Sequence, residues 1–171
     1  MRLAANTDPL TGLPNRRAAR VRMRAALAEA AGTAAPFTIA LIDLDYFKSI
    51  NDRFGHATGD TVLVQFAVVA RGLLRSTDLV ARVGGEEFLV LMPGCGLADA
   101  SRTIEALRDR MLGLSLTPEP SFRCTFSAGL AAFEGQSLEQ LLNAADKALY
   151  RAKENGRDRT FTAPTSASNA A

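Results

Sequence analysis

Residues 82–88 read Arg82-Val83-Gly84-Gly85-Glu86-Glu87-Phe88, which places two adjacent carboxylates directly after a pair of glycines. Short apolar segments flank them, 79–81 before and 88–92 after, and both predict strands. Two residues between such strands predict a tight hairpin in which glycine supplies positive φ angles. A ligand can approach the bare backbone of the glycines, and a carboxylate that begins the second strand can hold a divalent cation against a phosphate. The alternative is a surface hairpin whose carboxylates are merely solvated.

Helices and strands are expected on both sides of this hairpin. Apolar spacing and the Gly and Pro positions set their limits. Strands mixed with helices and one hairpin favour an α/β (α+β) sandwich of the ferredoxin-like kind, with a mixed antiparallel sheet flanked by helices. The expected elements are helices over 14–29, 60–74, 97–112 and 137–155, and strands over 37–42, 122–130 and 159–161.

Length and composition predict a single globular domain. The chain has 171 residues, 47% of them hydrophobic and 22% charged, and no apolar run approaches the ~20 residues of a membrane span. A formal net charge of +2 is too small to argue for nucleic-acid binding. Without a secretory signal or a disulfide framework, cytoplasmic residence is expected. We assign the domain to residues 1–161 and expect a disordered tail over 162–171.

Four further blocks accompany the hairpin motif. They are 8–17 (Asp-Pro-Leu-Thr-Gly-Leu-Pro-Asn-Arg-Arg), 43–52 (Asp-Leu-Asp-Tyr-Phe-Lys-Ser-Ile-Asn-Asp), 54–60 with its Phe-Gly-His start and Gly-Asp end, and 145–157. In this order the blocks resemble the GGDEF family of diguanylate cyclases in its GGEEF form, over about residues 6–158. The resemblance implies a fold with a sheet like the palm of nucleotide cyclases and polymerases.

The resemblance implies that two GTP molecules condense into cyclic di-GMP and release two pyrophosphates. Each step is attack of a ribose 3′-hydroxyl on an α-phosphate, assisted by two Mg²⁺ ions per site, with Mn²⁺ as a substitute. The family's metal ligands match Asp43, the carbonyl of Leu44, and Glu86. Glu87 is expected either to complete the metal environment or to assist proton removal. Asp45 has two open interpretations, a site residue or a structural carboxylate.

Phosphate binding is expected from the turn that follows the strand over 37–42 and from the last helix. Phe47 and Lys48 begin a helix whose exposed N–H groups favour an anion, and Lys48 is also counted with the catalytic residues. Lys153 and Arg157 match the family's phosphate-binding cations, although a helix C-terminus alone explains such cations. Gly84 and Gly85 are expected to touch the substrate.

Guanine recognition is expected from Asn51 and Asp60. The Asp60 carboxylate can accept hydrogen bonds from the ring N–H and exocyclic amine of guanine, whereas adenine offers neither. An N-cap role for Asp60 in the following helix is the alternative. The single histidine, His56, is expected to fix the loop of its motif rather than to act as a base.

The Arg75-Ser76-Thr77-Asp78 segment has the RxxD pattern at the family's usual interval before Gly84. It resembles the inhibitory product site, in which Arg75 and Asp78 would bind cyclic di-GMP. A further arginine is often used, and the sequence leaves Arg102 and Arg108 as candidates.

The resemblance also implies partners. Two copies must face each other around the two nucleotides, so a homodimer is needed for turnover, and an upstream sensor or dimerisation domain is expected outside this chain. Val83 and Asp158 depart mildly from the family's pattern without removing a proposed ligand. The alternative function is a catalytically weak domain that acts as a receptor for cyclic di-GMP or GTP.

Overall fold

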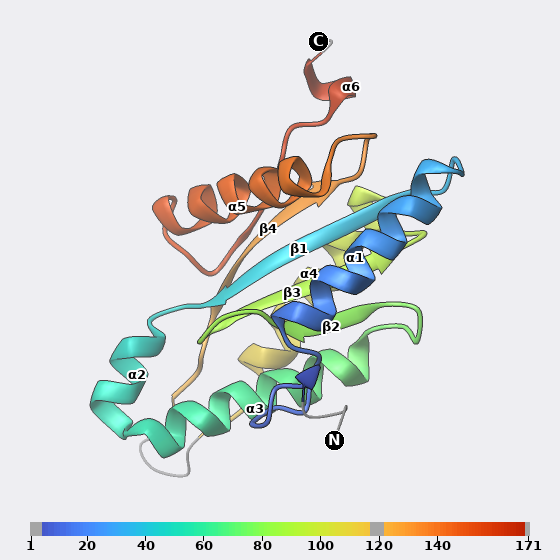
Figure 1. Ribbon diagram of the computed structural model, residues 1–171. Helices are drawn as coiled ribbons and strands as arrows, with labels where there is room; N and C mark the ends of the chain where they lie inside the picture. Colours follow the sequence, from blue (N-terminus) through green and yellow to red (C-terminus); the bar gives the residue numbers. More distant parts are fainter. Residues whose placement is uncertain (1–4, 117–121, 170–171) are drawn as a thin grey trace.

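A single mixed sheet organises the computed structural model, which describes residues 5–116 and 122–169 (Figure 1). Its strand order is β2-β3-β1-β4-β5. The strands are β1 (Phe37–Leu44), β2 (Leu79–Arg82), β3 (Glu87–Pro93), β4 (Phe126–Ala132) and β5 (Thr160–Thr162), and the helices are α1 (Arg16–Ala31), α2 (Phe47–Phe54), α3 (His56–Leu73), α4 (Leu97–Leu112), α5 (Leu138–Glu154) and α6 (Ser166–Asn169).

The topology confirms the ferredoxin-like prediction. From β1 to β4 the elements follow the β-α-β-β-α-β order, with the adjacent helices α2 and α3 in the first connection. Strand β1 is central and antiparallel to both β3 and β4, while β5 pairs in parallel with β4 at the edge. No helix among the described ranges is long and apolar enough to cross a membrane.

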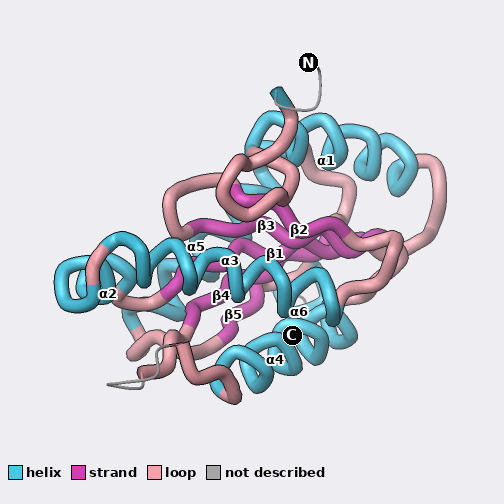
Figure 2. The backbone as a smooth tube through the Cα atoms, turned by 90° about the horizontal axis from the view of Figure 1, so that it is seen from below, coloured by secondary structure: helices cyan, strands magenta, loops and turns pink. Residues whose placement is uncertain are grey.

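Helices cover both faces of the sheet. Alternate residues of β1 point to opposite faces, so Ile39 packs with α1 and α5 while Ile42 packs with α3 and α4. Figure 2 shows the strands between α1 on one side and α4 on the other. Burial on both faces explains why the sequence of β1 is almost continuously apolar.

Several element boundaries differ from the prediction. Helix α1 begins at Arg16, because the side chain of Asn15 caps it by accepting a hydrogen bond from the Ala18 N–H at 3.0 Å. Helix α3 begins at His56, four positions before the expected start, so Asp60 lies inside the helix and is not its N-cap. Strand β4 begins at Phe126 rather than at residue 122.

The glycines of the hairpin do not have the predicted conformation. Residues 83–86 separate β2 from β3, and neither Gly84 nor Gly85 has a positive φ. Gly84 is instead needed for close packing: a Cβ there would lie 2.6 Å from Oε2 of Glu87. A Cβ on Gly85 would meet nothing within 4 Å. Gly84 therefore makes room for the Glu87 side chain rather than supplying a left-handed turn, and Gly85 is under no such constraint.

The chain after β5 continues into α6, within the segment over 162–171 for which disorder was expected. Ala163 is buried, and its N–H donates to the Leu130 carbonyl at 2.7 Å. The Ser166 N–H donates to the Glu134 carboxylate at 3.1 Å. Polar bonds to the β4–α5 connection thus hold a segment with little apolar surface to bury. Residues 170 and 171 lie outside the described residues.

Candidate active site

The carboxylates of the two acidic motifs meet at one end of the sheet. Asp43 on β1 is the register partner of Glu87 on β3, and the Leu44 N–H donates to the Glu86 carbonyl at 3.1 Å. Asp43, Leu44 and Glu86 line a common pocket of about 280 Å³. The antiparallel pairing of β1 with β3 therefore brings together the two segments that the sequence treats as metal-binding.

Lys153 reaches this pocket from α5 and forms an ion pair with Asp43. The Asp43 side chain is 10% exposed, so its charge would be costly without such a partner. Lys153, expected on phosphate, here neutralises a candidate metal ligand.

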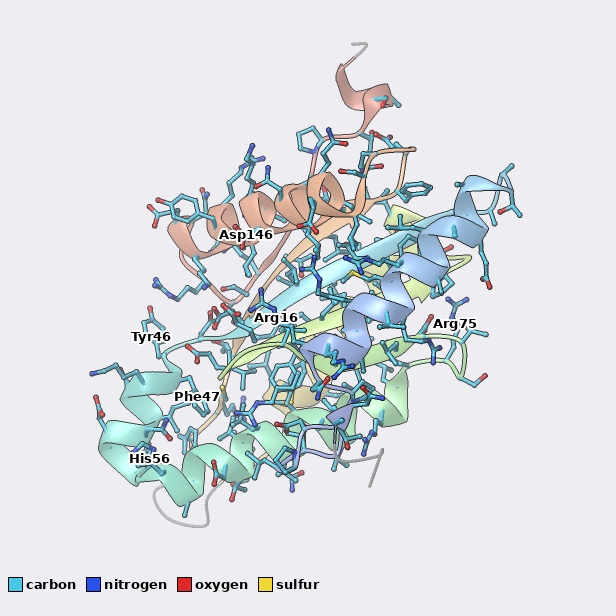
Figure 3. The ribbon with its side chains drawn as sticks, viewed as in Figure 1. Arg16, Tyr46, Phe47, His56, Arg75 and Asp146 are labelled. Carbon is cyan, nitrogen blue, oxygen red and sulfur yellow. The ribbon has the colours of Figure 1, made fainter. Side chains whose placement is uncertain are left out.

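The other cations of the pocket are less constrained. The Lys48 side chain is 91% exposed and lies 3.3 Å from Asp52, one helical turn away. The guanidinium of Arg157 lies 5.0 Å from the ring centroid of Tyr46, itself exposed at the mouth of the pocket (Figure 3). The full lining is Asp43, Leu44, Asp45, Tyr46, Phe47, Lys48, Ser49, Glu86, Lys153 and Arg157.

Unusual backbone conformations surround this pocket. Among the described residues, the non-glycine positions with positive φ are Tyr46 (54°), Arg157 (63°) and Asp158 (43°). Tyr46 is also the N-cap residue of α2 and makes no side-chain cap bond. The first N–H groups of α2 therefore lack a cap at the pocket, which suits an anion. Strained residues of this kind cluster at functional sites.

Asp45 is a structural carboxylate. It is 5% exposed and accepts hydrogen bonds from the hydroxyls of Thr125 and Ser127, each at 2.7 Å, and from the Asp158 N–H at 3.0 Å. These bonds occupy both oxygens and tie β1 to β4 and to the segment after α5. The structure thus decides between the two interpretations that the sequence left open.

Arg108 holds the same segment from α4. It donates to Asp158 at 3.0 Å, to Thr160 at 2.9 Å and to the Phe126 carbonyl, and its guanidinium lies 4.3 Å from the Phe126 ring centroid. The residue is 6% exposed. It is therefore unavailable to the inhibitory site, for which it was one of two candidates.

The expected guanine readers, Asn51 and Asp60, lie on the two helices that follow this pocket. Phe47 lines that pocket and also packs against Gly59, and a Cβ on Gly59 would lie 1.9 Å from the Asn51 Oδ1. This oxygen of Asn51 is the buried side-chain N or O that lacks a hydrogen-bond partner within the described part of the chain. Burying an unpaired polar atom costs free energy of folding unless a ligand supplies the missing hydrogen bond. Asp60 follows Gly59 on α3 and is exposed.

Arg82 fixes the hairpin, a role the sequence did not suggest. Its Nη2 and Nε donate to the Gly85 carbonyl at 2.8 and 3.0 Å, while Nη1 donates to both oxygens of Asp8. Burial of Asp8 opposes its ionisation, but hydrogen bonds from Thr11 and Arg82 outweigh this effect and lower the pKa of the carboxyl. The sequence offered one signal for this bond, because Asp8 begins one of the motifs and Arg82 begins another.

The donor set fits a hard divalent cation. Asp43 and Glu86 supply carboxylate oxygens and Leu44 a backbone carbonyl, whereas no group of three or more His, Cys, Asp or Glu side chains with metal-binding geometry occurs in residues 5–116 and 122–169. Mg²⁺ is commonly held by one or two carboxylates, with substrate phosphates and water completing its shell.

Arg75 and Asp78 lie at the opposite end of the β2–β3 hairpin. Arg75 donates to the Asp78 carboxylate through Nε and Nη2, at 3.1 and 2.7 Å, and this bonding raises the pKa of the guanidinium. Asp78 is 2% exposed at its side chain and Arg75 53%. The charges of Arg75, Asp78 and Arg102 all act on the Cys95 thiol. Arg102, one of the two candidate arginines, therefore lies near the Arg75–Asp78 pair.

His56 does not have the expected structural role. It is exposed at the start of α3, away from Tyr46 and Phe47 (Figure 3), and its side chain makes no hydrogen bond with the residues that the structure describes. The loop before it depends instead on Gly55, whose φ is 89°.

Comparison with known proteins gives concordant matches. The family model described as "Diguanylate cyclase, GGDEF domain" matches residues 5–159. Diguanylate cyclase DgcP of Pseudomonas aeruginosa is 45% identical over 92% of this chain and 24% of its own length. Response regulator PleD of Caulobacter vibrioides is 42% identical over 90% of this chain and 35% of its own length. The chain thus spans about a quarter to a third of these curated relatives.

Solved structures agree with the fold. The coiled coil and GGDEF domain of DgcB from Caulobacter crescentus, in complex with c-di-GMP, superposes with a TM-score of 0.90 at 33% identity, covering 95% of this chain and 87% of that one. The active GGEEF domain of a diguanylate cyclase from Vibrio cholerae gives 0.85 at 33% identity, covering 90% and 99%.

Proposed function

Because the chain belongs to the GGDEF family of diguanylate cyclases, we propose that it condenses two GTP molecules into cyclic di-GMP and releases two pyrophosphates. The observation that carries this proposal is one pocket in which Asp43 and Glu86 meet three cations. Carboxylates for a metal and cations for a triphosphate are the groups that phosphoryl transfer requires.

Asp43, Glu86 and the Leu44 carbonyl would hold Mg²⁺ or Mn²⁺, with two ions expected per site. A cation held there would neutralise phosphate charge and make the attacking 3′-hydroxyl more acidic. Lys153 pairs with the Asp43 carboxylate and holds it in place until then. Once that carboxylate has another partner, the Lys153 ammonium is free to bind phosphate.

The triphosphate would lie against the first turn of α2, with Lys48 and Arg157 on either side. The Tyr46 ring, whose centroid is 5.0 Å from the Arg157 guanidinium, would help to hold this cation at the pocket. Asn51 would accept a hydrogen bond from the guanine amine through its unsatisfied Oδ1, and Asp60 would accept from the adjacent ring N–H. GTP is thereby preferred over ATP.

Glu87 is the candidate that removes the proton of the attacking hydroxyl. Its side chain lines a second cleft between α1 and α5, whereas Glu86 faces the metal pocket. The hydroxyl belongs to a nucleotide carried by a second copy, so the active unit is a homodimer. This placement favours proton removal over metal binding for Glu87.

Arg75 and Asp78 would bind the product and inhibit turnover. When the product binds, the Arg75 guanidinium and the Asp78 carboxylate would separate from each other. Each would then form charge-assisted hydrogen bonds with a guanine edge. The site lies at the end of the hairpin opposite the catalytic carboxylates, so occupancy need not block GTP.

Incubation with GTP and Mg²⁺ at high protein concentration, with chromatographic separation of products, tests the proposal. Cyclic di-GMP should accumulate with wild type and not with Glu86→Gln. Unchanged GTP, even when two copies are forced together by a fused dimerisation segment, contradicts it. Product binding without turnover would instead support the receptor function.

A further inference from the structure

The turn that follows α5 has an unusual backbone conformation. Gly156, Arg157 and Asp158 all have positive φ, at 111°, 63° and 43°. Glycine adopts this region freely and aspartate tolerates it, whereas an arginine is strained there. A strained residue keeps such a conformation only where its surroundings hold it. The contacts of this turn therefore decide where Arg157 lies.

Asp158 anchors the turn at two buried points. Its N–H donates to Oδ2 of Asp45 at 3.0 Å, and its Oδ1 accepts from Nη1 of Arg108 at 3.0 Å. Both partners are buried. Arg108 is itself fixed, because the same guanidinium donates to Thr160 and to the Phe126 carbonyl. The end of the turn is thus tied to both β1 and α4.

The Arg157 side chain has no comparable anchor of its own. Its guanidinium has no hydrogen-bond or ion-pair partner within residues 5–116 and 122–169, and it lies 5.0 Å from the Tyr46 ring centroid. Yet this side chain lines the pocket that contains Asp43 and Glu86. The backbone of the turn, rather than a bond to the guanidinium, therefore places the cation there. A cation held in this way is preorganised and remains free to bind an anion.

Asp158 is also a position at which the chain departs from the family's pattern. Its carboxylate supplies a charged partner to the Arg108 side chain, which is only 7% exposed. A buried guanidinium without such a partner is costly. Glu105 also contacts Arg108, at 3.2 Å, but the Glu105 side chain is half exposed. The departure at position 158 is therefore matched by the arginine that α4 supplies.

We infer that Arg108 and Asp158 are positioning residues for the triphosphate and that they act through Arg157. Their ion pair holds residues 156–158 in the left-handed conformation and so keeps the Arg157 guanidinium at the pocket. Neither residue lines that pocket, so their effect on the nucleotide is indirect. The inference rests on the proposed function for the identity of the bound phosphates.

Nucleotide affinity in Asp158→Ala, which lacks both the acceptor and the tolerance of positive φ, tests this role. Isothermal titration calorimetry with Mg²⁺ and a GTP analogue whose α–β bridge is a methylene group measures affinity without turnover. We expect the dissociation constant to rise about tenfold, as for a lost hydrogen bond to a charged group. Asp158→Asn keeps an acceptor and tolerates the left-handed region, so it should bind nearly as wild type. Asp109→Ala, exposed on α4, is the matched control and should bind as wild type.

A double-mutant cycle with Arg157→Ala separates positioning from a general structural role. If Asp158 acts through Arg157, then Asp158→Ala should weaken binding no further in the Arg157→Ala background. Arg108→Lys keeps the charge but loses the fork of donors, and it should behave in the same way in both backgrounds. An equal loss of affinity with and without Arg157 would overturn the inference. Wild-type affinity of Asp158→Ala in the otherwise intact chain would also overturn it.

The backbone of the turn gives a readout that does not depend on nucleotide. Nitrogen-15 relaxation should give the Arg157 amide an order parameter of about 0.85 in wild type and a lower value in Asp158→Ala. An equally rigid turn in the variant would contradict the inference. If wild type binds the analogue and the cycle behaves as expected but no cyclic di-GMP forms, the proposed reaction fails and the positioning role stands. Absence of analogue binding by wild type would overturn both.

Discussion

At the scale of single residues, Asp43 is the position on which the chemistry depends most. It is paired with Lys153 and lines the same pocket as Glu86. Asp43→Asn keeps the shape and removes the charge. Since a bound cation contributes several kcal/mol, we expect product formation to fall at least ~100-fold. Initial rates measure this. Asp109→Asn, exposed on α4, is the control, and an Asp43→Asn rate near wild type would contradict the assignment.

Asp60 is the residue that we propose to control the choice of base. Asp60→Ser removes the carboxylate expected to bind guanine, and kcat/KM for GTP relative to ATP should fall by about 10–100-fold, which corresponds to ~1–3 kcal/mol. Competition assays with both nucleotides give this ratio directly. A ratio equal to that of wild type would remove Asp60 from base recognition.

At the scale of elements, the hairpin depends on its two glycines unequally. Gly84→Ala brings a Cβ within 2.6 Å of Glu87 Oε2 and 3.1 Å of Glu87 Cβ, so the Glu87 side chain must turn away. Gly85→Ala meets open space. We expect Gly84→Ala to lose turnover at unchanged thermal stability and at unchanged Mn²⁺ binding. Retained turnover in Gly84→Ala would separate Glu87 from catalysis.

The Asp8–Arg82 bond couples the N-terminal loop to the hairpin and gives it a pH dependence. The pKa of Asp8 is lowered from its ordinary value of 3.8, so the bond stabilises the fold above that pH and is lost as pH falls further. Asp8→Asn should cost about 1–2 kcal/mol of unfolding free energy near neutral pH and progressively less as the pH falls below 3.8. Urea titrations over this range measure it, and a pH-independent difference would contradict the assigned bond.

The sequence patterns predicted the helices and strands better than they predicted the contacts between side chains. The apolar run of β1 and the helix expected from residue 137 follow from local signals, and both are confirmed, with Ser137 as the N-cap of α5. The Lys153–Asp43 pair joins residues 110 positions apart, which no local pattern specifies. The role of Gly84 was mistaken for the same reason, because a glycine in a turn does not reveal whether φ or a neighbouring side chain requires it.

At the scale of the whole molecule, the proposed sites of synthesis and of product inhibition lie at opposite ends of the β2–β3 hairpin. Replacing both Arg75 by Ala and Asp78 by Asn removes the product site without leaving a buried carboxylate unpaired. Added cyclic di-GMP should then no longer slow the initial rate, while the uninhibited rate stays as in wild type. Arg110→Ala, exposed on α4, is the control. Inhibition identical to wild type would exclude this site.

A cation shared by Asp43, Glu86 and the triphosphate is the claim on which the other assignments depend. Electron paramagnetic resonance of Mn²⁺ in the presence of a non-reacting GTP analogue measures it directly. Wild type should bind Mn²⁺ in a manner that requires the analogue, and both Asp43→Asn and Glu86→Gln should lose that signal. Equal Mn²⁺ binding by wild type and the two variants would contradict the account.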